Sequence, residues 1–392
     1  MPEAGRLRQG PASTAARQAM IDLPQTLPQT GIGEEAALAL LGGAAMDRRA
    51  DLAAPDVLAH MDPPSSDVAA RMAYLVAQAN QNLLHPATSP FATEAEALVL
   101  GWIVPTYGMA WGQFCSGSTL ANLTALWAAR EAGARKVVAS AEAHISVPKA
   151  ARILGMDYHA VPVGEEGRLI RDALPDLADA ALVLTAGTTG RGAIDELSPL
   201  PAKWLHVDAA WAGPLQFTKY RDRLAGIAAA DSIAISAHKW FFQPKGAALA
   251  LFRDVDAKAS ITSTSSYLAR PNSGVEGTRS AAALPLLATL LAWGQAGLAE
   301  RIERCMAIAE DLAQRLDADP RTEVKQAPES GVLNWRPVQA DPAAVIAALE
   351  GTSSAFTIGE GLWVRQVAAN PHAEVDAIWS RIDAALAMGT AP

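Results

Sequence analysis

Lys239 is the residue of this sequence whose type and position are most clearly suited to a chemical role. It follows the apolar run Ser232–Ile235 and lies between His238 and Trp240. A lysine at the end of a buried strand loses contact with solvent, which lowers its pKa and favours the neutral amine that can form an imine. An isolated lysine past a strand end is more often a surface residue, so its role depends on what other segments supply.

A carboxylate, Asp208, ends a second apolar run, Trp204–Val207. An acid at this place can hold the proton of a pyridine nitrogen, and the small Ala210 leaves space beside it for a flat ring. The alternative is an aspartate that caps the following turn, which is the commoner role of an isolated Asp.

A third segment, Phe114–Asn122, places Gly117, Ser118 and Thr119 at the start of an expected helix. The free N–H groups and the positive dipole end of a helix can bind a phosphate, although the same residue types commonly cap a helix without any ligand. Pyridoxal phosphate requires a lysine that forms an imine, an acid that holds the proton of its ring nitrogen and a site that binds its phosphate. The three segments therefore predict this cofactor together, although each is weak alone.

Other chemistry is disfavoured by the sequence. The segment Gly187–Gly192 has the spacing of a P-loop, but Ala193 and Ile194 stand where Lys and Ser/Thr are required. The 7 histidines are dispersed, with no HExxH or CxxC, so we expect no metal site. With 41 acidic against 32 basic residues and a net charge of -9, we expect no nucleic-acid partner.

The elements that must position these segments alternate between apolar strands and helices. We expect helices over Thr119–Glu131 and Pro148–Leu154, and strands over Val137–Ala139, Ala181–Leu184, Trp204–Val207, Ser232–Ile235 and Ala247–Phe252. Such a pattern predicts an α/β fold with a largely parallel sheet covered on both faces. Ligands of such sheets bind beyond the carboxyl ends of the strands.

The remaining pattern predicts three parts in the 392-residue chain: an N-terminal arm and helix over 1–50, a large cofactor-binding domain over 51–295 and a small C-terminal α/β domain over 296–392. Further helices are expected over Glu34–Leu41, Asp67–Leu84, Thr93–Ile103, Ser280–Leu316 (broken near Gly294–Leu298) and Ala373–Ala387, and strands over Val332–Trp335 and Leu362–Val367. The sequence shows no membrane span or signal peptide, so we expect a cytoplasmic protein with no membrane partner.

The sequence resembles the pyridoxal-phosphate-dependent group II amino-acid decarboxylases, which have the aspartate-aminotransferase-like fold called fold type I. The likeness covers most of the chain from about Asn80 and is carried by Ser89–Glu96, Ser140–Ser146, Thr185–Asp195 and, most specifically, His206–Ala210 and His238–Trp240. The compact length and Gly277–Ser280 look most like the archaeal-type tyrosine/aspartate decarboxylases. The resemblance implies a large domain with a mostly parallel seven-stranded sheet and a smaller C-terminal α/β domain.

The resemblance also implies roles for individual residues. Lys239 is expected to form the Schiff base, Asp208 to hold the pyridine nitrogen and His144 to stack on the ring, and the cofactor phosphate and ring edges are expected to contact Ser118, Thr119, Ser236, His238, Thr188 and Ala210. Arg279 is a candidate for the rim of the active site or the neighbouring subunit's phosphate, and Arg365 for a substrate carboxylate. His144 or Tyr267 is the expected proton donor. A homodimer with shared active sites is implied.

The activity that the resemblance implies is decarboxylation of an L-amino acid to an amine and carbon dioxide. Ser118-Thr119-Leu120 differs from the family's usual Gly-Ser/Thr-Glu, and the loop from Tyr267 to Gly277 is shorter than in larger members. These differences leave two alternatives open. One is a lyase, aldolase or decarboxylation-coupled aldehyde synthase that uses the same cofactor, and the other is a binding protein with a degenerate site. No residue indicates which substrate side chain is accepted.

Overall fold

The computed structural model describes residues 23–389, and the described residues form two compact units that meet in the sequence between Asp51 and Leu52. In the first unit, helix α1 (Glu34–Asp47) continues past the predicted end at Leu41, and none of its residues is buried. The N-terminal arm predicted before the Glu34 helix falls largely on residues 1–22, which lie outside the described part of the chain.

The second unit contains a seven-stranded sheet with the order β1-β7-β6-β5-β4-β2-β3. All neighbouring strands are parallel except β7, which is antiparallel to both β1 and β6. The strands are β1 (Trp111–Cys115), β2 (Lys136–Ser140), β3 (Asp157–Val161), β4 (Ala180–Thr185), β5 (Trp204–Asp208), β6 (Ser232–Ser236) and β7 (Ala248–Phe252). The mostly parallel sheet predicted from the sequence is thus confirmed.

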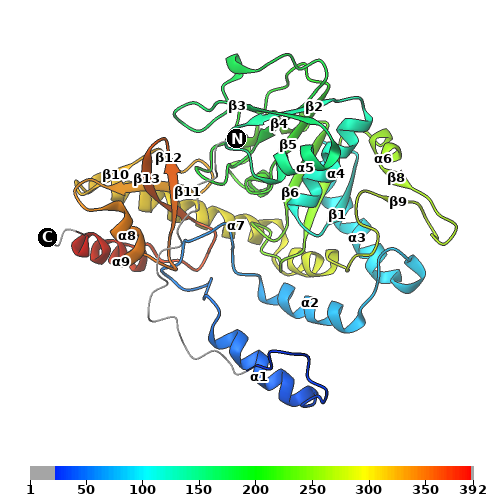
Figure 1. Cartoon of the computed structure of the whole chain (residues 1–392), viewed down its shortest axis with the longest axis horizontal. Helices are drawn as coiled ribbons and strands as arrows, with labels where there is room; N and C mark the ends of the chain where they lie inside the picture. Colours follow the sequence, from blue (N-terminus) through cyan, green and yellow to red (C-terminus); the bar gives the residue numbers. More distant parts are fainter. Residues whose placement is uncertain (1–22, 390–392) are drawn as a thin grey trace. The chain divides into compact units, whose positions relative to one another are not determined.

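Side chains of different size cover the two faces of this sheet. Successive residues of β4 point to opposite faces, so Ala181 and Val183 pack with α4 (Ser118–Glu131) and α5 (Ser146–Leu154), while Leu182 and Leu184 join the larger core on the other face. Figure 1 shows α4 and α5 lying against the sheet. Small residues on the α4 side let the helix approach closely, which brings its N-terminus to the ends of the strands.

The second unit contains further helices. They are α2 (Asp67–Ala79), α3 (Pro90–Ile103) and the short α6 (Asp256–Ser260), with 3-10 turns at Pro86–Thr88, Val104–Tyr107, Arg171–Ala173, Gly213–Phe217, Arg221–Leu224 and Ile227–Ala229. Helix α2 ends five residues before the predicted Leu84, because Asn80 adopts a left-handed conformation with φ 45°. Two short strands, β8 (Thr262–Ser263) and β9 (Asn272–Ser273), pair at the base of a loop.

Helix α7 (Ala283–Ala318) leads to a second, smaller sheet. Its backbone breaks at Gly294 (φ 61°, ψ -176°), as the sequence predicted. The antiparallel order is β10-β11-β13-β12, formed by β10 (Thr322–Val324), β11 (Val332–Pro337), β12 (Ser354–Ile358) and β13 (Gly361–Val367), with helices α8 (Pro342–Ala348) and α9 (Val375–Met388). The domain boundary predicted at residues 295 and 296 falls just after this break and stays a prediction.

No helix within residues 23–389 is both long and apolar enough to cross a membrane.

Candidate active site

A cavity of about 270 Å³ lies at the carboxyl ends of the central strands of the large sheet. Its wall collects residues that are far apart in the sequence: Gly117, Ser118, Thr119, His144, Thr185, Gly187, Thr189, Asp208, Ala210, Trp211, His238 and Lys239. Parallel strands bring their carboxyl ends to one edge of the sheet, so the loops that follow β2, β4, β5 and β6 meet there with the start of α4. The cavity thus contains most of the residues that the sequence singled out.

Lys239 reaches this cavity from the turn that follows β6. Burial lowers the pKa of the Lys239 ammonium, and the positive charges of Lys245 and Arg365 act in the same direction, although the carboxylates of Asp208 and Asp62 oppose them. The neutral amine is therefore favoured more than in a lysine in water, as the imine-forming role requires. The Nζ atom lies 3.9 Å from Met61 Sδ.

Asp208 is the last residue of β5 and is only 3% exposed. Its Oδ2 accepts a hydrogen bond from Nδ2 of Asn122 (2.9 Å), and its Oδ1 accepts one from the N–H of Ala210 (3.1 Å). Two donors held in place keep the carboxylate in one orientation at the cavity wall.

His144 lines the cavity from the loop after β2. Its Nδ1 lies 2.8 Å from the hydroxyl of Ser146 and accepts the N–H of the same serine at 3.2 Å. Partial burial lowers the pKa of the His144 imidazole; the charges of Lys239 and Lys149 add to this effect and Asp208 opposes it. A neutral ring is the form that such an environment favours.

The start of α4 faces the same cavity. Ser118 and Thr119 occupy its first turn after the cap Gly117, so the free backbone N–H groups of a 14-residue helix are available to an anion. His238 completes this side of the cavity. Its Nδ1 donates to the carbonyl of Ala247 (3.1 Å), which leaves Nε2 to accept from the hydroxyl of Ser236 (3.1 Å).

One hydroxyl group in the wall of the cavity lacks a hydrogen-bond partner among the described residues. The Oγ1 atom of Thr185 is buried and has no hydrogen-bond partner among the described residues. Buried hydroxyls are normally paired, so an unpaired one in the wall of a cavity fits a bound polar group. With the α4 N-terminus, Asp208 and Lys239 around one space, the residues fit pyridoxal phosphate.

Besides Arg365, four predicted residues lie outside the wall of this cavity. Thr188 is buried, and its hydroxyl accepts the N–H of Ala193 (3.1 Å), while Thr185 and Thr189 line the cavity in its place. Ser236 is buried behind His238. Tyr267 is 71% exposed, on the loop between β8 and β9. The fourth, Arg279, lies elsewhere.

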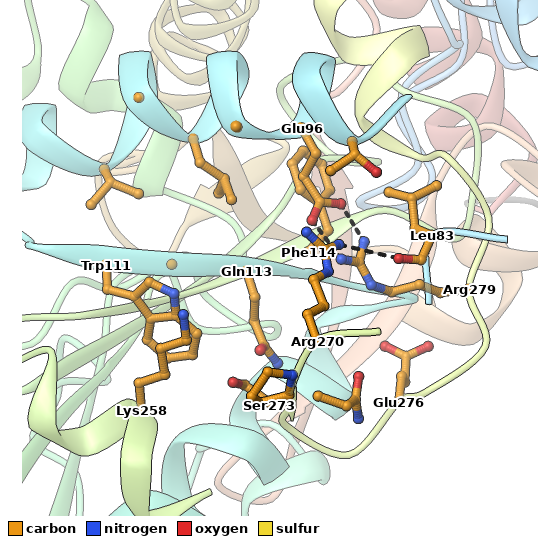
Figure 2. Close-up of a pocket in the computed structure, with 18 of the residues that line it drawn as sticks. Leu83, Glu96, Trp111, Gln113, Phe114, Lys258, Arg270, Ser273, Glu276 and Arg279 are labelled. Atoms are coloured by element: carbon orange, nitrogen blue, oxygen red, sulfur yellow. Dashed lines mark hydrogen bonds and ion pairs between the residues drawn. The ribbon is translucent and has the colours of Figure 1, made fainter. Parts of the chain in front are cut away.

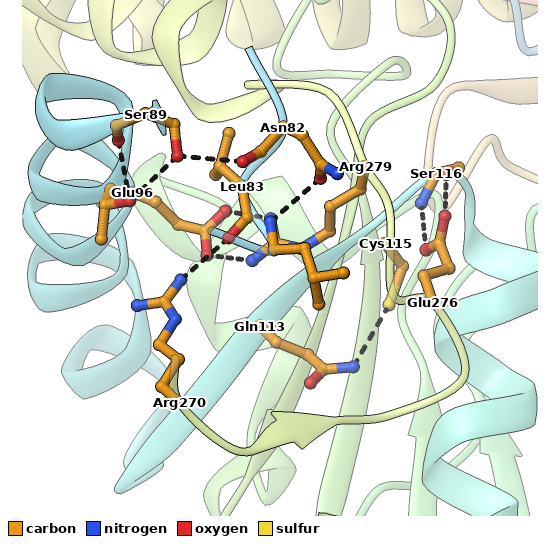
Figure 3. Close-up of polar contacts among 12 residues, drawn as sticks. Asn82, Leu83, Ser89, Glu96, Gln113, Cys115, Ser116, Arg270, Glu276 and Arg279 are labelled. Carbon is orange, nitrogen blue, oxygen red and sulfur yellow. Dashed lines mark hydrogen bonds and ion pairs between the residues drawn. The ribbon is translucent and has the colours of Figure 1, made fainter. Parts of the chain in front are cut away.

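Arg279 lines a different and larger cavity of about 450 Å³, formed by α3, β1 and the loop that follows β9 (Figure 2). Both of its terminal nitrogens contact the carboxylate of Glu96, and the two side chains are only 17% and 10% exposed (Figure 3). The guanidinium is therefore already engaged by an acid of its own chain.

Arg365 lies beside the smaller cavity. It is 6% exposed on β13, where its Nε donates to the carbonyl of Thr189 (2.7 Å) and its Nη1 to the hydroxyl of Ser354 (3.1 Å). Burial lowers the pKa of Arg365 to about 10, and Asp62 acts against this shift. Both of these oxygen partners are neutral, so the charge of the guanidinium is available to an anion near Thr189.

The sequence missed Thr185, Thr189 and Asn122. Thr185 could have been found, because it is the last residue of β4 and pairs in register with Asp208 of β5. The contact between Asn122 and Asp208 joins residues 86 positions apart and had no signal in the sequence.

Known proteins share this fold and much of this sequence. The glutamate decarboxylase domain of diaminobutyrate-pyruvate transaminase and L-2,4-diaminobutyrate decarboxylase from Vibrio parahaemolyticus superposes with a TM-score of 0.79 at 20% identity, over 93% of this chain and 88% of that one. L-2,4-diaminobutyrate decarboxylase from Rhizobium meliloti is 36% identical over 320 aligned positions, and the match covers 71% of this chain and 64% of the relative. A Methanopyrus kandleri protein named "probable L-tyrosine/L-aspartate decarboxylase" is 32% identical over 70% of this chain and 82% of its own length.

The chain spans less than two thirds of the length of the Rhizobium meliloti relative. The model of the pyridoxal-dependent decarboxylase conserved domain matches residues 51–336. This match covers most of the chain and includes each residue of the cavity wall, and it confirms both fold type I and the cofactor that the sequence predicted. The chain belongs to the pyridoxal-dependent decarboxylase family.

Proposed function

We propose that this protein is a decarboxylase that uses pyridoxal phosphate to convert an L-amino acid into an amine and carbon dioxide. The observation that carries the proposal is the meeting of Lys239, Asp208, His144 and the α4 N-terminus around one cavity. Family membership supports the same activity. When bound, the cofactor supplies an electron sink for the bond that breaks at the substrate Cα.

Each residue around the cavity would have a separate role toward the cofactor. Lys239 would attach the cofactor as a neutral amine and give way to the substrate amine. Asp208, held by Asn122 and the N–H of Ala210, would keep a proton on the ring nitrogen. His144 would cover one face of the ring, and the α4 N-terminus with Ser118, Thr119 and His238 would hold the phosphate.

Arg365 is the better candidate of the two predicted arginines for the substrate carboxylate. Its guanidinium is buried, and the oxygens of Thr189 and Ser354 that accept its hydrogen bonds are neutral; Thr189 also lines the cavity. Arg279, in contrast, is neutralised by Glu96. A buried guanidinium has a strong preference for a carboxylate partner, so a substrate acid at Thr189 would be attracted to Arg365.

The proton that returns to Cα would come from His144 or Tyr267. Tyr267 is exposed on its loop and would have to move to reach the cavity, whereas His144 already lines it. This arrangement favours His144. The exposure of Tyr267 also motivates the second candidate function, an aldehyde-forming or other Cα-cleaving lyase, because poor protonation of Cα would divert the reaction.

A homodimer with shared active sites is part of the proposal. Large apolar side chains are exposed on α2 and α3, namely Tyr74 (65%), Leu75 (52%), Phe91 (62%), Leu98 (46%) and Trp102 (43%). Exposed apolar groups of this size commonly mark interfaces between subunits. Sedimentation of the purified protein at twice the mass of one chain would support the dimer.

The cytoplasm is the proposed location of the protein, and cell fractionation tests it.

The function is tested with purified protein, pyridoxal phosphate and a panel of diaminobutyrate, aspartate, glutamate, tyrosine and tryptophan. We expect a visible absorbance band from the lysine-bound cofactor and release of carbon dioxide with one member of the panel. Lys239→Ala should abolish both, while Lys245→Ala, which removes a neighbouring exposed lysine, should retain the band. A colourless wild-type protein would refute the cofactor site, and aldehyde or ammonia in place of amine would identify the second candidate function.

A further inference from the structure

A chain of buried polar groups runs beneath the cavity and ends at Asp208. It contains Trp204, Ser232, His206 and Asn122, which are between 0% and 7% exposed. The separations are 2.8 Å from Trp204 Nε1 to Ser232 Oγ, 2.8 Å from Ser232 Oγ to His206 Nδ1, 3.0 Å from His206 Nε2 to Asn122 Oδ1 and 2.9 Å from Asn122 Nδ2 to Asp208 Oδ2. Of these residues, only Asp208 lines the cavity.

The direction of every bond in this chain follows from Asp208. An ionised carboxylate can only accept, so the Asn122 amide must present its Nδ2 to Asp208 and its Oδ1 to His206. An amide oxygen also only accepts, so His206 must carry its proton on Nε2. The Nδ1 of His206 then accepts from the Ser232 hydroxyl, whose oxygen accepts the N–H of Trp204.

A second branch leads from Asn122 to His144. The other hydrogen of Asn122 Nδ2 points to Ser146 Oγ at 2.9 Å. The Ser146 hydroxyl is then left to donate to His144 Nδ1 at 2.8 Å, where the N–H of Ser146 also points. With two donors on Nδ1, the neutral His144 ring must carry its proton on Nε2.

Both histidines lie in surroundings that disfavour the charged ring. Burial lowers the pKa of His206 to about 4, and partial burial lowers the pKa of His144. The charged groups that act on these rings are Asp208 on both, and Lys239 and Lys149 on His144. Asn122 is therefore bonded to one carboxylate and, directly or through Ser146, to two neutral imidazoles.

We infer that Asn122 is a positioning residue that orients Asp208, sets the tautomer of His206 and, through the hydroxyl of Ser146, supports that of His144. Through the Asn122 amide, the cavity contains an Asp208 carboxylate that is free to accept a hydrogen bond and a His144 ring that carries its proton on Nε2. The inference rests on the proposed function for the roles of Asp208 and His144, but the tautomers themselves are properties of the protein alone.

The test measures tautomers directly, by proton–nitrogen correlation spectra of protein labelled in the histidine rings, with and without pyridoxal phosphate. In the wild type we expect neutral rings for His144 and His206 with the proton on Nε2. In Asn122→Leu the Nε2 of His206 loses its acceptor, so we expect His206 to show a mixture of tautomers. We also expect pyridoxal phosphate to bind about tenfold more weakly, which corresponds to about 1.4 kcal/mol.

Two further variants keep the inference testable. Asn122→Asp preserves the size of the side chain but places an acid against His206, so the His206 ring should become protonated near neutral pH even if Asn122→Leu fails to fold. Asn370→Leu removes another buried amide, one that donates to the Ala54 carbonyl, and should leave both tautomers unchanged.

Two results would overturn the inference: a wild-type His144 with its proton on Nδ1, or a folded Asn122→Leu with wild-type tautomers. Failure of the proposed function looks different. In that case the cofactor-free protein would show the expected tautomers and no visible band would form, so the network would stand and the assignment of the reaction would fall.

Discussion

Two cavities of the second unit, the one lined by Lys239 and the one lined by Arg279, differ in whether their polar groups already have partners. In the larger one, Arg279 is paired with Glu96, and the carboxylate of Glu276 receives both the N–H and the hydroxyl of Ser116 (Figures 2 and 3). In the smaller one, the Thr185 hydroxyl has no partner in the described chain and the pKa of Lys239 is lowered by burial. The smaller cavity, although its volume is the lesser of the two, therefore holds the groups suited to chemistry.

The largest effect is expected where the smaller cavity loses its acid. Asp208→Asn should lower kcat at least about a thousandfold, because the amide cannot keep a proton on the ring nitrogen. Glu276→Gln is the matched change in the larger cavity and should leave kcat within about threefold. Steady-state kinetics on both proteins check this contrast, and equal losses would show that the two cavities are not distinct in function.

Arg279 should matter for stability more than for chemistry. Arg279→Ala leaves Glu96 as an uncompensated, mostly buried carboxylate, which should lower the free energy of unfolding by about 3 kcal/mol. Replacing both residues, as Arg279→Met with Glu96→Gln, should restore most of that loss. Urea unfolding of the cofactor-free protein measures both. A stable Arg279→Ala with a greatly raised KM would instead make Arg279 a substrate ligand.

A smaller effect on the free energy of unfolding is expected when the pH is lowered, because His206 lies buried beneath the smaller cavity. Its pKa of about 4 in the folded state lies below the usual value near 6.5, so the unfolded chain binds the proton first as the pH falls. The folded state should therefore lose about 2 kcal/mol between pH 7 and pH 4.5 from this group.

His206→Gln should reduce the difference in unfolding free energy between these two pH values by that amount. His372→Gln, a change at an exposed histidine, should not alter it. Urea unfolding at both pH values provides the comparison. If the wild type and His206→Gln lose the same stability on acidification, His206 is not held neutral in the folded protein.

Burial decided which elements the sequence could predict. Strands β4, β5, β6 and β7 are buried at every position, and their continuous apolar runs were recognised. Strand β3 lies at the edge of the sheet with four of its five residues exposed, and β12 alternates between exposed and partly buried residues. Neither has the continuous apolar run by which strands were identified, so both were missed.

The residues of the candidate site could be predicted where the neighbouring sequence alone indicates their position. Lys239, Asp208 and His144 each follow a predicted strand, and parallel topology brings such positions together. The start of α4 was predicted from its own residue types, whereas strand β1 before it was not predicted. Thr188 was chosen within its segment, but the turn after β4 directs its hydroxyl to Ala193 and leaves Thr185 and Thr189 at the cavity.

The sequence by itself determined the buried central strands with the helices between them, the chemical types at the ends of these strands and, through them, the cofactor. Only the tertiary structure decided which charges are neutralised and which protons are held: Glu96 pairs with Arg279 across 183 positions, and Asn122 reaches Asp208 across 86. The physical reason is that hydrophobic patterning is periodic along the chain, whereas a hydrogen bond depends on two atoms that only the folded backbone brings within 3 Å of one another.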